Sequence, residues 1–371
     1  MANIKIGIVG IGAISGIYLE NITNMFKEIE IIGVCDLIRE RAEAAVEKYS
    51  IPKLYNDMHE LFADPEVDIV LNLTRPYEHY DVTIAAIAAG KHVYSEKPLG
   101  ATLDEGKKLV AAALEKGVLI GGAPDTFLGA GIQTARKLID DGAIGTPVGA
   151  SAFMVCRGHE TWHPDPEFYY KHGGGPLFDM GPYYLTALVN LLGGIQSVSG
   201  MARASFPQRT ITSQPKFGTI VDVDVPTYIT GMLQFASGAI GTIFTTFDAY
   251  IAEVPRIEIY GSAGTLSVPD PNCFGEAGNV RLYRPEAGKF MEVPHMFPYP
   301  ANSRALGLAD MAKAIQSGRD FRATSKLTFH VLEVMSGILQ SAKDGANVKM
   351  ASAVERPALM VPATLPGYFE A

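Results

Sequence analysis

The sequence predicts an α/β protein in two parts. The first is a doubly wound parallel sheet, and the second is an α/β domain with a large open, mostly antiparallel sheet. Through the first third of the chain, short apolar runs alternate with helical patterns, which is typical of repeated β-α-β units. From residue 146 onward the apolar runs follow one another across short turns. A length of 371 residues fits two domains, which we place at 1–124 and 125–371.

The first element is a buried strand that leads into a glycine-rich turn and a helix. Its sequence, Gly10-Ile11-Gly12-Ala13-Ile14-Ser15, reads G-x-G-x-x-S and closely matches the dinucleotide-binding fingerprint. The first glycine permits the turn, the second admits the pyrophosphate, and the small third residue lets the helix pack on the strand. The helix N-terminus offers N–H groups to phosphate. We assign to the cofactor Gly10, Gly12, Ala13, Ile14 and Ser15.

The second strand, residues 30–36, ends in Asp36. This acid follows Ser15 by roughly the 20 residues that separate the fingerprint from a ribose-binding carboxylate. Asp36 would accept hydrogen bonds from the adenosine hydroxyls and repel a 2′-phosphate, so NAD is favoured over NADP. Arg39 and Arg41 lie close enough to weaken that preference. Strand, turn, helix, strand and acid together predict a Rossmann domain.

The alternation continues to residue 124. Helices are expected at 39–50, 57–64, 79–90 and 102–117, and strands at 52–55, 67–74, 91–98 and 118–124. Ligands of such sheets bind at the carboxyl ends of the strands. Those ends carry Thr74, Pro76 and His79, then Glu96-Lys97-Pro98, and finally Asp125. We expect Thr74, Pro76, His79 and Asp125 to line the cofactor.

The second part is expected to be a sheet with strands at 146–156, 197–206, 225–235, 238–249 and 255–269. Turns such as Ala236-Ser237-Gly238 suit hairpins between them. An antiparallel sheet with one open face often pairs with a second copy. We therefore expect a homo-oligomer, a dimer or a tetramer.

Three segments resemble the Gfo/Idh/MocA family, which includes glucose–fructose oxidoreductase, inositol dehydrogenases and dihydrodiol dehydrogenases. They are YSEKPLGATLDEGKKLV, GGGPLFDMGPYYLTALVNLLG (173–193) and RALGLADMAKAIQSGRDFRA (304–323). With the fingerprint, the resemblance covers essentially the whole chain. It is specific for the family and not for a substrate. It implies an N-terminal Rossmann domain to about residue 124 and a second domain with the large sheet.

The resemblance also implies the catalytic residues. Lys97 matches the family's essential lysine, and an ammonium beside the reacting hydroxyl would stabilise the developing alkoxide. Glu96 would position Lys97 or the nicotinamide ribose. Asp179 and Tyr183 match the family's pair, although histidine is common at the second position and Pro182 interrupts the helical spacing. Some members that resemble glucose–fructose oxidoreductase also carry tyrosine there. Either Asp179 or Tyr183 would move the proton.

The segment His159-Glu160-Thr161-Trp162-His163 reads H-E-x-x-H, a zinc-protease motif that requires a continuous helix. Gly158 before it and two prolines after it argue against a helix, so no metal is expected. The family resemblance implies a loop over the active-site cleft. Trp162 would contact the nicotinamide or a sugar face. The hydroxyls of the substrate would meet Arg157, His159, His163 and Asp165.

The expected function is that of an NAD-dependent oxidoreductase. Hydride would pass between nicotinamide and a secondary alcohol of a sugar, a glycoside (with C3 as a candidate carbon) or a polyol such as inositol. Two alternatives are an NAD-dependent glycosidase with internal redox recycling and a non-enzymatic NAD-sensing regulator. Presence of Lys97, Asp179 and Tyr183 argues against the regulator.

Composition limits the other classes. The net charge of −9, without a long basic run, argues against nucleic acid as a partner. Only three cysteines occur, far apart, which favours a reducing compartment without disulfides. Neither a secretory leader nor a membrane span is expected, so the predicted location is the cytoplasm.

Overall fold

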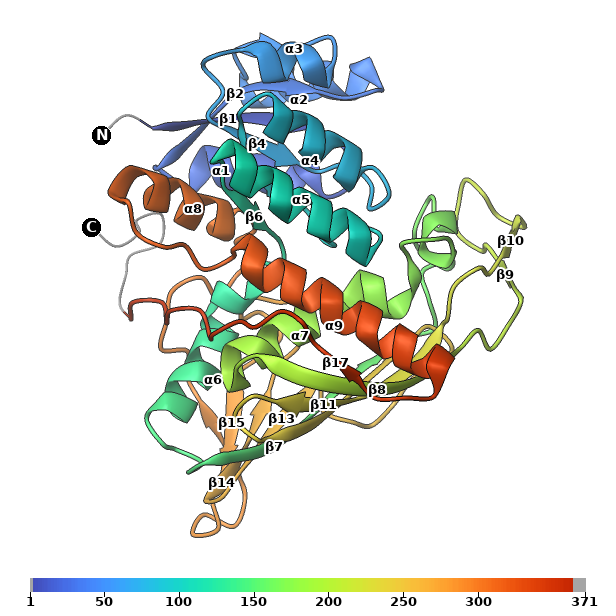
Figure 1. Ribbon diagram of the computed structural model, residues 1–371, viewed down its shortest axis with the longest axis vertical. Helices are drawn as coiled ribbons and strands as arrows, with labels where there is room; N and C mark the ends of the chain where they lie inside the picture. The colour runs from blue at the N-terminus through green and yellow to red at the C-terminus, as the bar shows by residue number, and fades with distance from the viewer. Residues whose placement is uncertain (1–2, 363–371) are drawn as a thin grey trace.

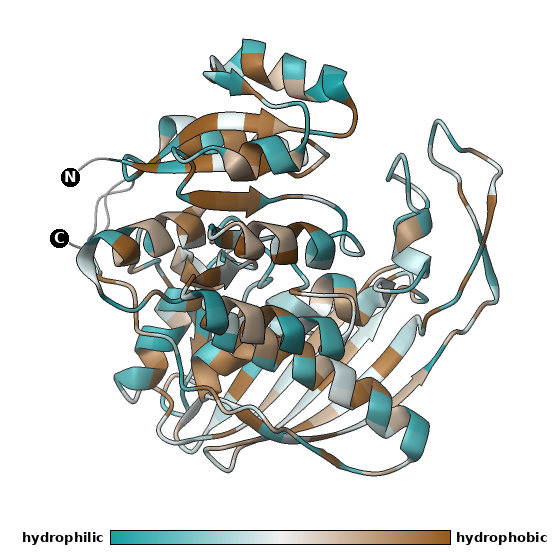
Figure 2. Ribbon diagram, turned by 45° about the horizontal axis from the view of Figure 1, so that its top comes forward, coloured by the Kyte–Doolittle hydropathy of each residue, from teal (hydrophilic) through white to brown (hydrophobic). Residues whose placement is uncertain are grey.

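A computed structural model describes residues 3–362. The N-terminal half is a parallel sheet of six strands in the order β3-β2-β1-β4-β5-β6 (Figure 1), the Rossmann order. Its strands are mostly hydrophobic (Figure 2), as expected where helices cover both faces. The strands are β1 (Ile4–Val9), β2 (Ile29–Cys35), β3 (Lys53–Leu54), β4 (Ile69–Asn72), β5 (His92–Ser95) and β6 (Ile120–Gly122).

Five helices connect these strands, and their ends follow local chemistry. Asp57 caps one of them by accepting from the backbone N–H groups of His59 and Glu60. Thr102 and Glu105 form a capping box at the start of another. The helices are α1 (Ser15–Asn24), α2 (Arg39–Tyr49), α3 (Met58–Ala63), α4 (His79–Ala88) and α5 (Leu103–Lys116).

The second half is built on a sheet of nine strands in the order β16-β15-β14-β13-β7-β12-β11-β8-β17. Only the pair β7 and β12 is parallel, so the sheet is mixed and mostly antiparallel as predicted. The three outermost strands β15, β16 and β17 were not predicted. The strands are β7 (Pro147–Val155), β8 (Ile195–Arg203), β11 (Tyr228–Phe235), β12 (Ile240–Thr246), β13 (Ile257–Gly261), β14 (Gly264–Val268), β15 (Val280–Tyr283), β16 (Phe290–Val293) and β17 (Val348–Lys349).

Helices cover one face of this sheet and leave the other open (Figure 1). Along β11 the residues alternate between exposed and buried, which is the pattern of a strand with one solvent face. Gly238 adopts a positive φ of 88° in the predicted turn between β11 and β12. The helices of this half are α6 (Ala130–Asp140), α7 (Gly175–Leu192), α8 (Leu306–Ser317) and α9 (Ser325–Asp344), with short 3-10 turns η1 (Thr126–Leu128) and η2 (Glu167–Tyr170).

The two halves share a boundary formed by the C-terminal helices. Helices α8 and α9 both contact β6, and α9 also contacts α5. Gly121 in β6 forms a bridge with Thr324, the residue that caps α9. The domain division at residue 124 remains a prediction, because segments from beyond it help cover the first sheet.

One segment of the second half projects away from the sheet, at the right of the view (Figure 1). It carries the two-stranded ribbon of β9 (Gln208–Thr210) and β10 (Ile220–Asp222), which the sequence analysis did not predict. We call residues 204–226 the arm. Within residues 3–362, no helix is long and apolar enough to cross a membrane.

Candidate active site

The glycine-rich turn between β1 and α1 has the geometry that a dinucleotide requires. Gly10 has a φ of +96°, and a Cβ there would lie 2.9 Å from the backbone of Leu73. A Cβ at Gly12 would meet nothing within 4 Å, so its backbone faces open space where a pyrophosphate would fit. The buried Ser15 donates from its hydroxyl to the Gly12 carbonyl at 2.8 Å. Ala13 is exposed and Ile14 half-buried beside them.

Asp36 lies at the end of β2 beside this turn. Its carboxylate accepts from the backbone N–H of Ile11 at 2.6 Å and of Ile38 at 2.7 Å. Each carboxylate oxygen has a second lone pair, so both remain able to accept a ribose hydroxyl. Turn and acid therefore fit the adenosine half of a dinucleotide.

The loop after β4 brings Thr74 and Pro76 to the same edge of the sheet. Both are half-buried, and the Thr74 hydroxyl donates to Asn72 at 2.6 Å. His79 is buried, and its two ring nitrogens face the carbonyls of Pro98 at 2.8 Å and Thr74 at 3.0 Å. The imidazole therefore links the loop after β4 to the turn that carries Lys97.

Glu96 and Lys97 follow β5 at the same edge of the sheet. Glu96 is buried and accepts from the Tyr18 hydroxyl at 2.7 Å and from the Lys97 backbone N–H at 3.0 Å. The Lys97 side chain extends to α7 in the second half of the molecule. Its ammonium donates to the backbone carbonyl of Asp179 at 2.7 Å and to the Asp179 carboxylate at 2.8 Å. Glu96 thus holds the backbone from which Lys97 reaches across.

Asp179 lies between two nitrogens, because His159 Nε2 is 3.0 Å from its other carboxylate oxygen. The three side chains are only 12–15% exposed. Burial opposes the charge of Lys97, but Asp179, Tyr183 and Glu96 together outweigh burial, and the pKa of the ammonium is raised. Burial opposes the carboxylate of Asp179 too, but Lys97 and His159 hold its pKa well below the ordinary range. Lys97 is therefore a fixed cation, and Asp179 a poor proton acceptor.

Tyr183 lies one turn after Asp179 in α7, which continues through Pro182. The Lys97 ammonium sits over its ring, 5.2 Å from the centroid. Arg304 Nη2 is 3.5 Å from the Tyr183 hydroxyl, and the same guanidinium donates to Asn272 at 2.9 Å. The sequence analysis missed Arg304, a buried cation that the segment before α8 brings to the site.

The H-E-x-x-H segment forms a turn and not a helix, as predicted. His159 points to Asp179, whereas the buried Glu160 pairs with Arg209 of the arm at 3.0 Å. His159 Nδ1 is buried and has no hydrogen-bond partner among residues 3–362. The imidazole packs against the rings of Tyr169 and Phe247, with centroids 4.2 and 4.8 Å away. The sequence analysis did not predict the bond between His159 and Asp179.

The other residues assigned to the substrate lie around this turn. Trp162 is 61% exposed and meets the His159 ring edge-on at 5.2 Å. The pKa of His163 is lowered, chiefly by burial. Asp165 is engaged in ion pairs with Arg75 at 3.0 Å, which joins the two halves, and with Lys216 at 2.6 Å.

Two predicted residues have partners away from Lys97. The Arg157 guanidinium lies between the rings of Phe206 and Tyr250, 5.1 and 4.8 Å from their centroids. Asp125 is buried and accepts from the backbone N–H of Gly307 in α8 at 3.0 Å. Burial raises the pKa of Asp125 to about 6. Their proposed contacts with substrate and cofactor remain predictions. Within the described part of the chain, no group of His, Cys, Asp and Glu could hold a metal ion.

A Rossmann sheet with a glycine-rich turn after β1, joined to a large mixed sheet, is the architecture of a two-part, dinucleotide-binding oxidoreductase. Two family profiles match: "Oxidoreductase family, NAD-binding Rossmann fold" over residues 4–122, and "GFO/IDH/MocA C-terminal domain" over residues 132–267. The chain belongs to the Gfo/Idh/MocA family.

Among curated relatives, inositol 2-dehydrogenase of Salmonella typhimurium is 37% identical over 172 residues. That alignment spans 44% of this chain and 48% of the relative, about half its length. The scyllo-inositol 2-dehydrogenase (NAD(+)) of Bacillus subtilis is 28% identical over 94% of this chain and 96% of its own. Among solved structures, levoglucosan dehydrogenase in complex with NADH superposes with a TM-score of 0.79 at 22% identity, covering 95% of this chain and all of that one. This superposition supports the fold.

Proposed function

We propose that this protein is an NAD-dependent dehydrogenase acting on a secondary alcohol of a cyclic polyol, a sugar or a glycoside. The observation that carries the proposal is the buried contact of Lys97 with Asp179, 2.8 Å apart at the carboxyl edge of the Rossmann sheet. Relatives named as inositol 2-dehydrogenases support the substrate class.

Bound NAD would take up the hydride. Lys97, kept charged by Asp179, would hold the substrate oxygen and stabilise the negative charge that develops on it. Asp179 has one oxygen on Lys97 and the other on His159, so its task is to orient these two groups. That leaves the Tyr183 hydroxyl for proton transfer. Arg304 donates to the Tyr183 oxygen, so the phenolic proton is free to point to the substrate.

The preference for NAD over NADP rests on Asp36. Its carboxylate is fixed by two backbone N–H groups at the position where a ribose would lie. A 2′-phosphate there would meet a like charge, which costs several kcal/mol.

The test is the formation of NADH, followed by absorbance, with a panel of inositols, free sugars and glycosides, and NADP in parallel. We expect turnover with NAD on at least one cyclic polyol or sugar. Release of an aglycone without net NADH would instead indicate internal redox recycling. Silence with every substrate and both cofactors would overturn the proposal.

A further inference from the structure

An arginine of the arm contacts the chain on both sides of the active-site histidine. Arg209, in β9, has a side chain only 3% exposed. Its Nη1 donates to the Glu160 carboxylate at 3.0 Å and to the Arg157 carbonyl at 3.4 Å. Those two residues flank the short stretch that carries His159. The guanidinium therefore restrains the turn from both directions.

The same guanidinium also fixes the wall against which His159 packs. Its Nη2 donates to the Phe247 carbonyl at 3.0 Å and pairs with the carboxylate of Asp248. The ring of Phe247 lies 4.8 Å from the His159 imidazole. The buried Arg209 guanidinium thus joins the turn that carries His159 to the end of β12, where Phe247 packs against the imidazole.

The backbone of the arm adds to this restraint. The N–H groups of Thr212 and Ser213 donate to the Glu160 carbonyl at 2.8 and 3.0 Å. The Ser213 hydroxyl donates to the His163 carbonyl at 2.5 Å. The whole H-E-x-x-H turn is therefore bound to the arm, and its glutamate is an anchor.

We propose that Arg209 is a positioning residue of the active site, which acts through Glu160 to hold His159 against Asp179. A buried, hydrogen-bonded ion pair is a costly way to stabilise a fold but a good way to specify one geometry. The His159 imidazole needs such help because, among the described residues, its only hydrogen bond is with Asp179, and its Nδ1 has no partner. The activity tests rest on the proposed dehydrogenase function.

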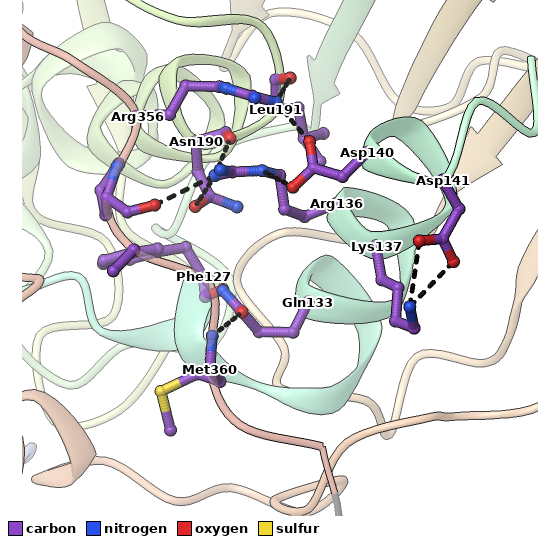
Figure 3. Close-up of polar contacts among 12 residues, drawn as sticks. Phe127, Gln133, Arg136, Lys137, Asp140, Asp141, Asn190, Leu191, Arg356 and Met360 are labelled. Atoms are coloured by element: carbon purple, nitrogen blue, oxygen red, sulfur yellow. Dashed lines mark hydrogen bonds and ion pairs between the residues drawn. The ribbon is translucent and has the colours of Figure 1, made fainter. Parts of the chain in front are cut away.

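The first experiment compares Arg209→Met, Arg209→Lys and a matched control in the full-length protein. The control is Arg136→Met. Arg136 is also a buried arginine, and its guanidinium contacts Asp140, Asn190 and Pro357 (Figure 3). None of these three partners belongs to the candidate active site. We expect Arg209→Met to lower kcat about tenfold or more, because a misplaced active-site group slows the reaction by at least this factor. Arg209→Lys should restore part of kcat. NAD affinity should stay unchanged, and Arg136→Met should lower only stability.

The second experiment asks whether Arg209 acts through His159. In the double variant Arg209→Met/His159→Asn, kcat should fall no further than in His159→Asn alone, because residues that act as a unit are not additive. Losses that multiply would overturn the proposal. So would an Arg209→Met enzyme indistinguishable from Arg136→Met. If Arg209→Met does not fold, Glu160→Gln replaces it and should show the same dependence on His159.

A readout without turnover separates this proposal from the dehydrogenase function. The imidazole N–H of His159 can be observed by NMR in ¹⁵N-histidine protein and assigned by its loss in His159→Asn. The signal of a proton hydrogen-bonded to Asp179 should be present in the wild type and Arg136→Met, and lost or shifted in Arg209→Met. An unchanged signal in Arg209→Met would overturn the positioning role even if no substrate is found.

Discussion

Lys97 donates from one ammonium to both the carbonyl and the carboxylate of Asp179, although the two residues lie on different halves of the molecule. The contact joins the end of β5 to the second turn of α7. Because the pair is buried, its attraction is weakly screened, and the lysine is charged before any substrate arrives. The predictions below test what this arrangement implies.

Replacing Lys97 by alanine should lower kcat/KM by about 10³-fold or more while the dissociation constant for NAD stays within about twofold of the wild type. The reason is that the ammonium contacts Asp179 in the second half, whereas the Gly10 turn and Asp36 follow β1 and β2. Steady-state kinetics and fluorescence titration with NADH would measure both quantities. Full activity in this variant would contradict the assignment of Lys97.

Replacing Tyr183 by phenylalanine should lower kcat by about 10²-fold or more, the usual loss when a general acid–base group is removed. The phenyl ring keeps its place beneath Lys97, so the affinity for NAD and the fold should be unaffected. Asp179→Asn tests the other candidate, and a loss of kcat confined to that variant would assign the proton to Asp179.

Replacing Asp36 by serine should raise the ratio of kcat/KM with NADP to that with NAD by about 100-fold, because the like charge facing a 2′-phosphate disappears. The serine hydroxyl can still donate to a phosphate oxygen. Initial rates with the two cofactors give the ratio, and a ratio unchanged by the substitution would show that Asp36 does not face the ribose.

The free energy of unfolding should fall as the pH rises, because the buried Asp125 carboxyl is less stable in its charged form. Burial raises its pKa from 3.8 to about 6, so between these values the native state binds more protons than the unfolded state, and stability falls with pH. The full difference, reached above pH 6, is about 3 kcal/mol at most. Asp125→Asn keeps an acceptor for the Gly307 N–H and should remove this dependence.

Urea unfolding of the wild type and Asp125→Asn at intervals from pH 4 to 8 would measure this effect. The gap between the two proteins should open in favour of the variant as the pH rises from about 4 to 6 and stay constant above that. Parallel curves would show that Asp125 is hydrated or paired in solution.

Local patterns were sufficient to predict the Rossmann half. Alternating apolar runs and the turn at Gly10 gave the order of elements, since each signal lies within a few residues. The family resemblance then brought Lys97, Asp179 and Tyr183 together, and the structure places them in contact. Short edge strands such as Phe290–Val293 carry too few residues for a pattern and were missed.

The partners of His159 and Glu160 could not be predicted for a different reason. Both reach residues in other elements, Asp179 in α7 and Arg209 in the arm, and no spacing rule encodes such contacts. An isolated arginine in a polar segment gives no sign that it will be buried. The H-E-x-x-H segment forms a turn, as Gly158 and the prolines indicated, but its sequence did not reveal that the glutamate is an anchor.

The bridge between Gly121 and Thr324 affects how this protein could be recombined with its relatives. Because α8 and α9 pack on β6, the cofactor-binding half is assembled from two stretches that are far apart in the gene. A chimera that exchanged only residues 1–124 would set a foreign β6 against native helices. Transplanting cofactor preference between relatives should therefore succeed through substitutions at Asp36, or through an exchange that carries both stretches together.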